Sequence, residues 1–477
     1  MGKIKEFINE TFIYGFANVF SRVFAMLLIP FYISNLGKIE YSNLVMIQSG
    51  FTILTFIMAL NSGVFYYYYE WKKEKHRKMI FSSWFYYQFF LAIIIGIILF
   101  FTAEYISGLL IETENNKDNL IISVKVLGLL FVPYIFNITN INFYRIDRRP
   151  KKAILVVFFE SLFTALIVII GLSYYNFGIF EVVISQIIGR FIVSILFLKT
   201  IQSYFLWKYF SLKILKKLLY FSWPFFIISS FSWLISNIDK FIGVELLNNK
   251  EEIAILAFAF QITLPIAVLA DMIRMAIGPF IMSISAETNA NKTYQKVYDL
   301  CVFSGVLALV LLITFVPLIT YILADKSFLI VIKVVPLIGV ASILSLISNQ
   351  FSISFSLVKK NQYILIATVI SGALATFINL QFMNKYGFIV SGISQALSTL
   401  IMAIILFFLG RRITKLDINI NNSIIYLLVL GVFITFVYSY IPQILNGNYL
   451  QLIFSSLLAL IILLGLFIKT YLNKLNG

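Results

Sequence analysis

Ionisable side chains stand inside several long apolar runs of the sequence. Arg22, Arg190 and Arg274 are the arginines among them. An arginine at the centre of a membrane-spanning helix costs roughly 2.5–3.5 kcal/mol on insertion scales, so it must face water, a counter-charge or a ligand. Together with Lys240, these residues give the interior of the runs a positive balance.

Polar neighbours recur at helical spacing around these charges. Asn18 and Arg22 are four residues apart, and so are Gln186 and Arg190, so each pair shares one face of a helix. Helices that each present one polar stripe can close around a wet cavity. The residues that we expect to line such a cavity are Asn18, Arg22, Gln186, Arg190, Asn237, Lys240 and Arg274.

Two acids inside the runs leave more than one interpretation open. Asp271 and Arg274 are three residues apart and can form a structural ion pair along their own helix. Glu160 fits a packing role as well as it fits proton or sodium coupling. Arg22 and Arg190 have no acid within one helical turn, which favours a cavity or ligand role. We keep Glu160 and Asp271 as candidate ion-coupling residues.

These charges belong to a chain that is too apolar to be water-soluble. Its 477 residues have a mean hydropathy of +0.95, and only 12% are charged, against about 25% in a soluble domain. A spanning helix needs about 20 residues, and we count fourteen continuously apolar runs of that length. The alternating pattern of a membrane β-barrel is missing from them. We therefore predict an all-α polytopic membrane protein with about 14 transmembrane helices.

Several chemistries find no support in the sequence. There is one cysteine (Cys301) and one histidine (His76), which gives no basis for a disulfide or a Cys/His metal site. No phosphate-binding P-loop and no nucleophile elbow is present. The connections between runs are too short to fold as a catalytic domain. We expect no enzyme activity, no metal and no cofactor beyond a coupled proton or sodium ion.

Lysines and arginines collect in alternate connections, for example in 72–78 and 145–152. The connections between them carry acids such as Glu112 and Glu251. The positive-inside rule places the basic set, and with it both termini, in the cytoplasm. We expect the protein in the cytoplasmic (inner) membrane of a bacterium. Topology accounts for the net charge of +16, so no nucleic-acid partner is expected.

The sequence also repeats itself at an offset of about 210 residues. Segments 178–186 and 387–395 both begin with glycine and end with Ser-Gln at the same spacing. Six helices per repeat is an even number, so the halves share one orientation and are related by an axis along the membrane normal. The predicted organisation is a six-helix bundle over 1–210, a second over 211–415, and two further transmembrane helices over 416–477.

Together, several stretches resemble the polysaccharide transporters of the multidrug/oligosaccharidyl-lipid/polysaccharide (MOP) exporter superfamily, the O-antigen-type flippases. These stretches are Arg22 with Leu-Ile-Pro-Phe-Tyr at 28–32, Leu-Gly at 36–37 with Glu-Tyr at 40–41, 224–241, and the basic turns 145–152 and 359–361. The resemblance covers nearly the whole chain. It implies a MATE-like fold of two bundles around a central cavity that opens alternately to each side.

The same resemblance implies a cargo. It is an oligosaccharide repeat unit of O-antigen or capsule, linked to a polyprenyl diphosphate and moved to the outer leaflet. Related lipid II flippases use cationic residues on their first and eighth helices, which implies cargo binding by Arg22 and Arg274. Arginine suits this head group because it gives bidentate hydrogen bonds to phosphate. We expect a monomer in contact with membrane lipids, and glycosyltransferases and a polymerase of the same pathway as further partners.

Two alternatives remain. A cation-coupled multidrug exporter of the same superfamily is expected to have an acidic cavity, and the positive balance argues against it. A membrane polysaccharide polymerase or ligase is expected to carry a sizeable external loop. The longest external connections here, about 104–118 and 240–252, are short.

Overall fold

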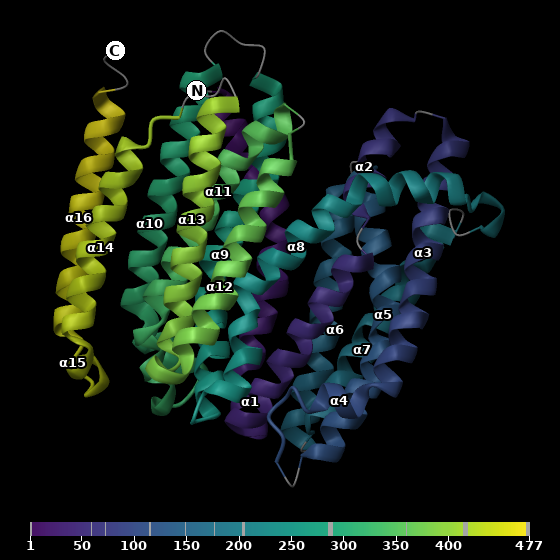
Figure 1. The fold of residues 1–477 in the computed structure, drawn as a ribbon, viewed down its shortest axis with the longest axis horizontal. Coiled ribbons are helices and arrows are strands. Elements are labelled where there is room, and N and C mark those ends of the chain that lie inside the picture. Colours follow the sequence, from purple (N-terminus) through teal and green to yellow (C-terminus); the bar gives the residue numbers. More distant parts are fainter. Residues whose placement is uncertain are drawn as a thin grey trace. The chain divides into compact units, whose positions relative to one another are not determined.

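The computed structural model describes residues 2–58, 60–71, 73–113, 116–147, 149–175, 177–202, 206–284, 290–358, 360–413 and 418–473 (Figure 1). Side chains are described in these ranges except at 2–20, 150, 200–201, 271, 274–284, 290, 356–357 and 470–473. Every secondary-structure element in the described part is helical. The predicted all-α fold is confirmed.

The chain forms two compact units, which we treat separately. The N-unit is residues 16–254, and the C-unit is residues 255–477 with 1–15. The helices up to the end of the N-unit are α1 Gly2–Met58, α2 Asn61–Glu70, α3 Glu74–Phe101, α4 Ala103–Ser107, α5 Lys117–Ile146, α6 Pro150–Tyr174, α7 Ile179–Ile201, the 3₁₀ helix η2 Trp207–Tyr209 and α8 Leu212–Leu246. The remaining helices are α9 Glu251–Ile284, α10 Ala290–Leu323, the 3₁₀ helix η3 Lys326–Lys333, α11 Val335–Leu357, α12 Gln362–Tyr386, α13 Ile389–Ile413, α14 Asn421–Ser439, α15 Ile441–Leu445 and α16 Leu450–Asn473.

Thirteen segments of the described residues are long and apolar enough to cross a membrane. One of them, Ser21–Glu70, holds two predicted runs. They are separated within α1 at Gly37, whose φ of 75° and ψ of 176° interrupt the helix. This left-handed φ is accessible to glycine at little energetic cost. Counting both runs gives the predicted fourteen.

Two predicted runs differ in detail from the structure. The run over 327–357 begins with the 3₁₀ helix η3, and α11 starts only at Val335. Pro336 accounts for this start because proline has no N–H and fits the first turn of a helix. The run over 41–66 is divided, since α1 ends at Met58 and α2 begins at Asn61.

Equivalent helices pack alike within the two units. In the N-unit, α7 packs on α5 and α6, and in the C-unit, α13 packs on α11 and α12. These are the helices that the sequence repeat pairs with one another. The correspondence supports the duplication, whereas the boundaries near residues 210 and 415 stay a prediction.

Basic connections gather at one end of the N-unit and mixed or acidic connections at the other. At the basic end, Tyr69 Oη donates to the carbonyl of Ile146 at 3.1 Å, and Ser82 Oγ donates to that of Leu206 at 2.8 Å. At the opposite end, Lys38 Nζ lies 2.9 Å from Glu251 Oε2. The predicted alternation is therefore confirmed for this unit. The assignment of the basic end to the cytoplasm stays a prediction.

Helices α3 and α5 approach closely at a pair of glycines. A Cβ atom added to Gly128 would lie 2.6 Å from the Cα of Gly96. We expect Gly128→Ala to lower the free energy of unfolding by about 1–3 kcal/mol, because this contact cannot admit a methyl group without a backbone shift. Thermal melting of the purified protein measures the effect. Gly431→Ala is the control, since a Cβ there meets nothing within 4 Å, and equal losses in both variants would contradict the prediction.

Candidate functional site

A polar cluster lies where α5, α6 and α7 meet in the N-unit. Arg190, near the middle of α7, places Nε 2.9 Å from Glu160 Oε1 on α6. Asn137 of α5 donates through Nδ2 to Glu160 Oε2 at 3.0 Å and to the carbonyl of Arg190 at 3.1 Å. Ser194 Oγ donates to Asn137 Oδ1 at 3.0 Å. We call these four residues the arginine cluster.

Helix α1 completes the surroundings of Arg190. The guanidinium carbon lies 5.5 Å from the ring centre of Phe51, within the range of a cation–π contact. Phe51 also lies edge-on to Tyr134 of α5, at 5.6 Å between ring centres. Within the described part of the chain, Arg190 Nη1 is buried and has no hydrogen-bond partner. The pair with Glu160 therefore leaves donor capacity on the guanidinium unused, which is costly in a buried site without a partner.

Gln186 lies one turn before Arg190 on α7 and is buried. Its side chain lies beside the hydroxyl of Tyr32 on α1. This contact ties the face of α7 that carries Arg190 to α1. It places two predicted site residues, Gln186 and Arg190, on one polar face as expected.

A second polar group joins α1 to α8, and we call it the lysine cluster: Ser49, Trp233, Asn237, Asp239 and Lys240. Lys240 Nζ lies 3.5 Å from Asp239 Oδ1, with side chains only 2% and 1% exposed. Ser49 Oγ donates to Asn237 Oδ1 at 3.2 Å, and Trp233 Nε1 donates to the carbonyl of Ser49 at 3.0 Å. Lys240 is thus held inside the N-unit beside a carboxylate.

The other predicted site residues are placed only in part. Arg22 is half-buried on α1. The side chains of Asn18, Asp271 and Arg274 lie outside the described residues. Their assigned roles stay predictions, as do those of Arg22, Arg190 and Glu160.

Sequence reasoning missed several members of these clusters. Asn137 is buried in an apolar stretch of α5 together with Asn140 and Asn142. Three buried amides in one membrane-spanning helix are a signal that could have been used, because unpaired polar groups are expensive there. Tyr32 and Tyr134, which lie next to the arginine cluster, carry no comparable signal, since tyrosine is abundant throughout this chain.

The described residues bring together no group of three His, Cys, Asp or Glu side chains that could hold a metal ion.

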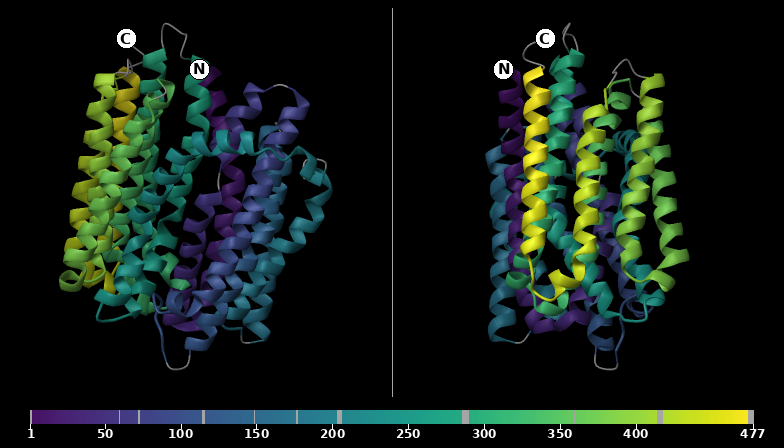
Figure 2. Two further views of the ribbon diagram at one scale, coloured as in Figure 1. Left: turned by 45° about the vertical axis from the view of Figure 1, so that its right-hand side comes forward. Right: turned by 90° about the vertical axis from the view of Figure 1, so that its left-hand side faces the viewer.

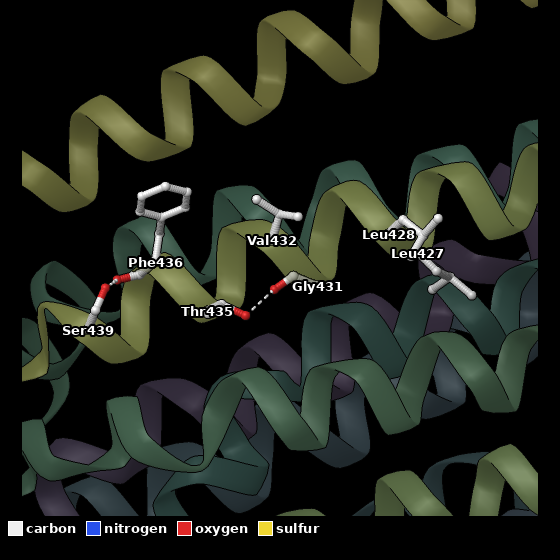
Figure 3. Close-up of a pocket in the computed structure, with 7 residues that line it drawn as sticks. All are labelled: Leu427, Leu428, Gly431, Val432, Thr435, Phe436 and Ser439. Atoms are coloured by element: carbon white, nitrogen blue, oxygen red, sulfur yellow. Dashed lines mark hydrogen bonds between the residues drawn. The ribbon is translucent and has the colours of Figure 1, made fainter.

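A groove lies on α14 of the C-unit and is lined mostly by apolar side chains (Figure 3). Its two hydroxyls bond back to their own helix, Thr435 to the carbonyl of Gly431 at 2.9 Å and Ser439 to that of Phe436 at 2.8 Å (Figure 3). The groove therefore presents mainly hydrocarbon.

Comparison with solved structures shows that this chain shares its fold with transporters that include a member of the MOP superfamily. It is similar to a lipid II flippase, MurJ, in an inward closed conformation, with a TM-score of 0.75 and 16% identity over 96% of this chain and 99% of that one. It is also similar to a multidrug resistance MATE family transporter of the MOP superfamily in an inward-facing conformation. That match has a TM-score of 0.67 and 15% identity over 84% of this chain and 94% of the other.

A comparison of the amino-acid sequence with known families gives a further match. Residues 69–289, a little under half of the chain, match the model of a family described as "Polysaccharide biosynthesis protein". No curated protein matches the chain at a significant level. The resemblance predicted from the sequence is confirmed. The protein has the fold of a multi-pass membrane protein, and its fold and family match are those of the resemblance.

Proposed function

We propose that this protein is a flippase that moves a polyprenyl-diphosphate-linked oligosaccharide from the cytoplasmic to the outer leaflet of a bacterial inner membrane. The observation that carries the proposal is Arg190, a guanidinium near the middle of a membrane-spanning helix with Nη1 unpaired among the described residues. The match to a polysaccharide biosynthesis family and the fold shared with a lipid II flippase support the same class of cargo.

The cargo defines what the protein must supply. A diphosphate with attached sugars cannot cross hydrocarbon unaided, whereas its polyprenyl tail can stay in the lipid. Arginine meets the diphosphate with bidentate, charge-assisted hydrogen bonds. An inside-negative potential favours outward movement of the anion by about 2.3 kcal/mol per charge and 100 mV. Alternating access of the two bundles would complete the transfer.

Glu160 links cargo binding to ion coupling in this proposal. It occupies Arg190 Nε while Asn137 holds its other oxygen. A proton or sodium ion taken up by the carboxylate would weaken its hold on the guanidinium and free that donor for the diphosphate. Ion uptake would then promote cargo binding, and Asp271 is the second coupling candidate.

Deletion of the gene tests the proposal against its alternatives in one experiment. The flippase account predicts loss of surface polysaccharide, retention of the lipid-linked repeat unit on the cytoplasmic side, and unchanged drug sensitivity. Increased drug sensitivity with normal polysaccharide would instead indicate a multidrug exporter. Repeat units that reach the outer leaflet but stay unpolymerised or untransferred would indicate a polymerase or ligase.

A further inference from the structure

The first turns of α8 run crosswise to the upright helices of the N-unit, over one end of them (Figures 1 and 2). Ser211 caps this start, with Oγ accepting from the backbone N–H of Ile214. Pro224 follows inside α8 and removes one backbone hydrogen bond, which allows a helix to bend. The first turns of α8 thus differ in direction from its later turns (Figure 1).

This crosswise stretch is amphipathic. Its buried face consists of Ile214, Leu215, Leu218 and Ser222. Its exposed face consists of Leu212, Lys213, Lys216, Lys217, Tyr220 and Trp223. At about 100° per residue, Leu212 and Trp223 lie along one edge of the exposed face, and Lys213 and Lys217 along the other. A helix lying in a membrane interface needs such a gradient from hydrocarbon to charge.

The turn that precedes α8 is fixed against α3. Ser82 Oγ donates to the carbonyl of Leu206 at 2.8 Å, and the N–H of Ser211 donates to Ser83 Oγ at 2.9 Å. Between these anchors, Trp207 is 56% exposed. Its ring lies edge-on to Tyr86 of α3 at 4.8 Å. Tryptophan is typical of the level of the lipid headgroups.

Positive charge accumulates on the same surface. Residues 206–223 contain four lysines and no acid. In the described part of the chain, no carboxylate forms an ion pair with Lys208, Lys213, Lys216 or Lys217. Lys217 Nζ lies 5.0 Å from the ring centre of Trp71, and Lys208 Nζ lies 5.3 Å from that of Tyr209. The aromatic rings hold these two ammonium groups at the surface without neutralising them.

We propose that residues 206–223 form a docking surface for the headgroups of anionic phospholipids. Trp207, Leu212 and Trp223 would enter the acyl boundary while the lysines meet the phosphates. The surface lies at the basic end of the N-unit, which faces the predicted cytoplasmic leaflet, where anionic lipids create a negative potential. This proposal does not depend on the identity of the cargo.

Tryptophan quenching by brominated lipids tests the docking surface. The full-length protein is reconstituted in phosphatidylcholine bilayers that contain equal fractions of brominated phosphatidylglycerol or brominated phosphatidylcholine. The quenching of Trp223 is the difference in fluorescence quenching between the parent protein and Trp223→Phe. We expect phosphatidylglycerol to bind this surface at least about fivefold more strongly than phosphatidylcholine does, since one lysine near a membrane surface contributes on the order of fivefold in affinity. The preference should fall as salt is raised.

The triple variant K213Q/K216Q/K217Q should lose this preference, with a melting temperature close to that of the parent. The matched control K292Q/K296Q/K360Q removes three exposed lysines of the C-unit and should keep it. Equal quenching by the two lipids, or an undiminished preference in the triple variant, would overturn the proposal. A loss of preference in both triple variants would show a general effect of charge and would equally overturn it.

Discussion

Arg190→Ala is expected to reduce transport at least about 100-fold while the protein still inserts in the membrane. The substitution removes the guanidinium that meets the diphosphate, and hydrogen bonds to charged groups contribute about 1.5–3 kcal/mol each. It also leaves Glu160 without the partner that lies 2.9 Å away. Surface polysaccharide in a complemented deletion strain, divided by the amount of protein in the membrane, measures the effect.

The double variant E160Q/R190Q separates the two contributions. It removes both charges of the pair but keeps amide groups that can bond to Asn137. If Arg190 binds cargo, this variant transports no better than Arg190→Ala. Recovery to near the parent level would show that Arg190 serves only to neutralise Glu160, and the cationic pathway would lose its best-defined member.

Asp239→Ala is expected to lower the free energy of unfolding by about 3–5 kcal/mol, the loss typical when one partner of a buried ion pair is removed. The carboxylate lies 3.5 Å from Lys240 Nζ, and both side chains are almost completely buried. Thermal melting in detergent, together with the yield of folded protein, measures the loss.

The paired variant D239L/K240M is the matched control for this second prediction. Replacing a buried ion pair by apolar residues of similar volume is often neutral or stabilising. We therefore expect its melting temperature to return close to that of the parent. A loss as large as that of Asp239→Ala would show that Lys240 has a partner more important than Asp239, and an unchanged Asp239→Ala would show that the pair contributes nothing.

Much of the architecture could be predicted from the sequence because the membrane imposes one simple requirement. Each span needs about 20 apolar residues with its backbone bonded internally, so run length locates the helices. Charge bias distinguishes the two ends of the N-unit. Lysines and arginines collect in the connections 72–78 and 145–152 at one end, whereas Lys38 pairs with Glu251 at the other. Local backbone features were harder to predict. The interruption at Gly37 depends on a left-handed φ, and the 3₁₀ start over 326–333 depends on how that turn packs.

Some residues of the candidate site, such as Arg190 and Glu160, could be predicted from the sequence, but their pairing could not. Helical spacing placed Gln186 and Arg190 on one face, which the structure confirms. The pairing of Arg190 with Glu160 depends on the rotation of α6 against α7, and nothing within one turn of either residue specifies that rotation. Gly189 permits the approach, since a Cβ there would lie 2.7 Å from the backbone nitrogen of Thr164. Close packing of this kind is a property of two helices together and is not visible in either one alone.

The most direct test of the central claim is translocation of a purified polyprenyl-diphosphate-linked oligosaccharide in proteoliposomes that contain only this protein. Cargo that reaches the opposite leaflet is detected by an enzyme confined to that side. Guanidinium-based transport predicts clear translocation by the parent protein and background levels in R22A/R190A at equal protein incorporation. Translocation by R22A/R190A at the parent rate would contradict it.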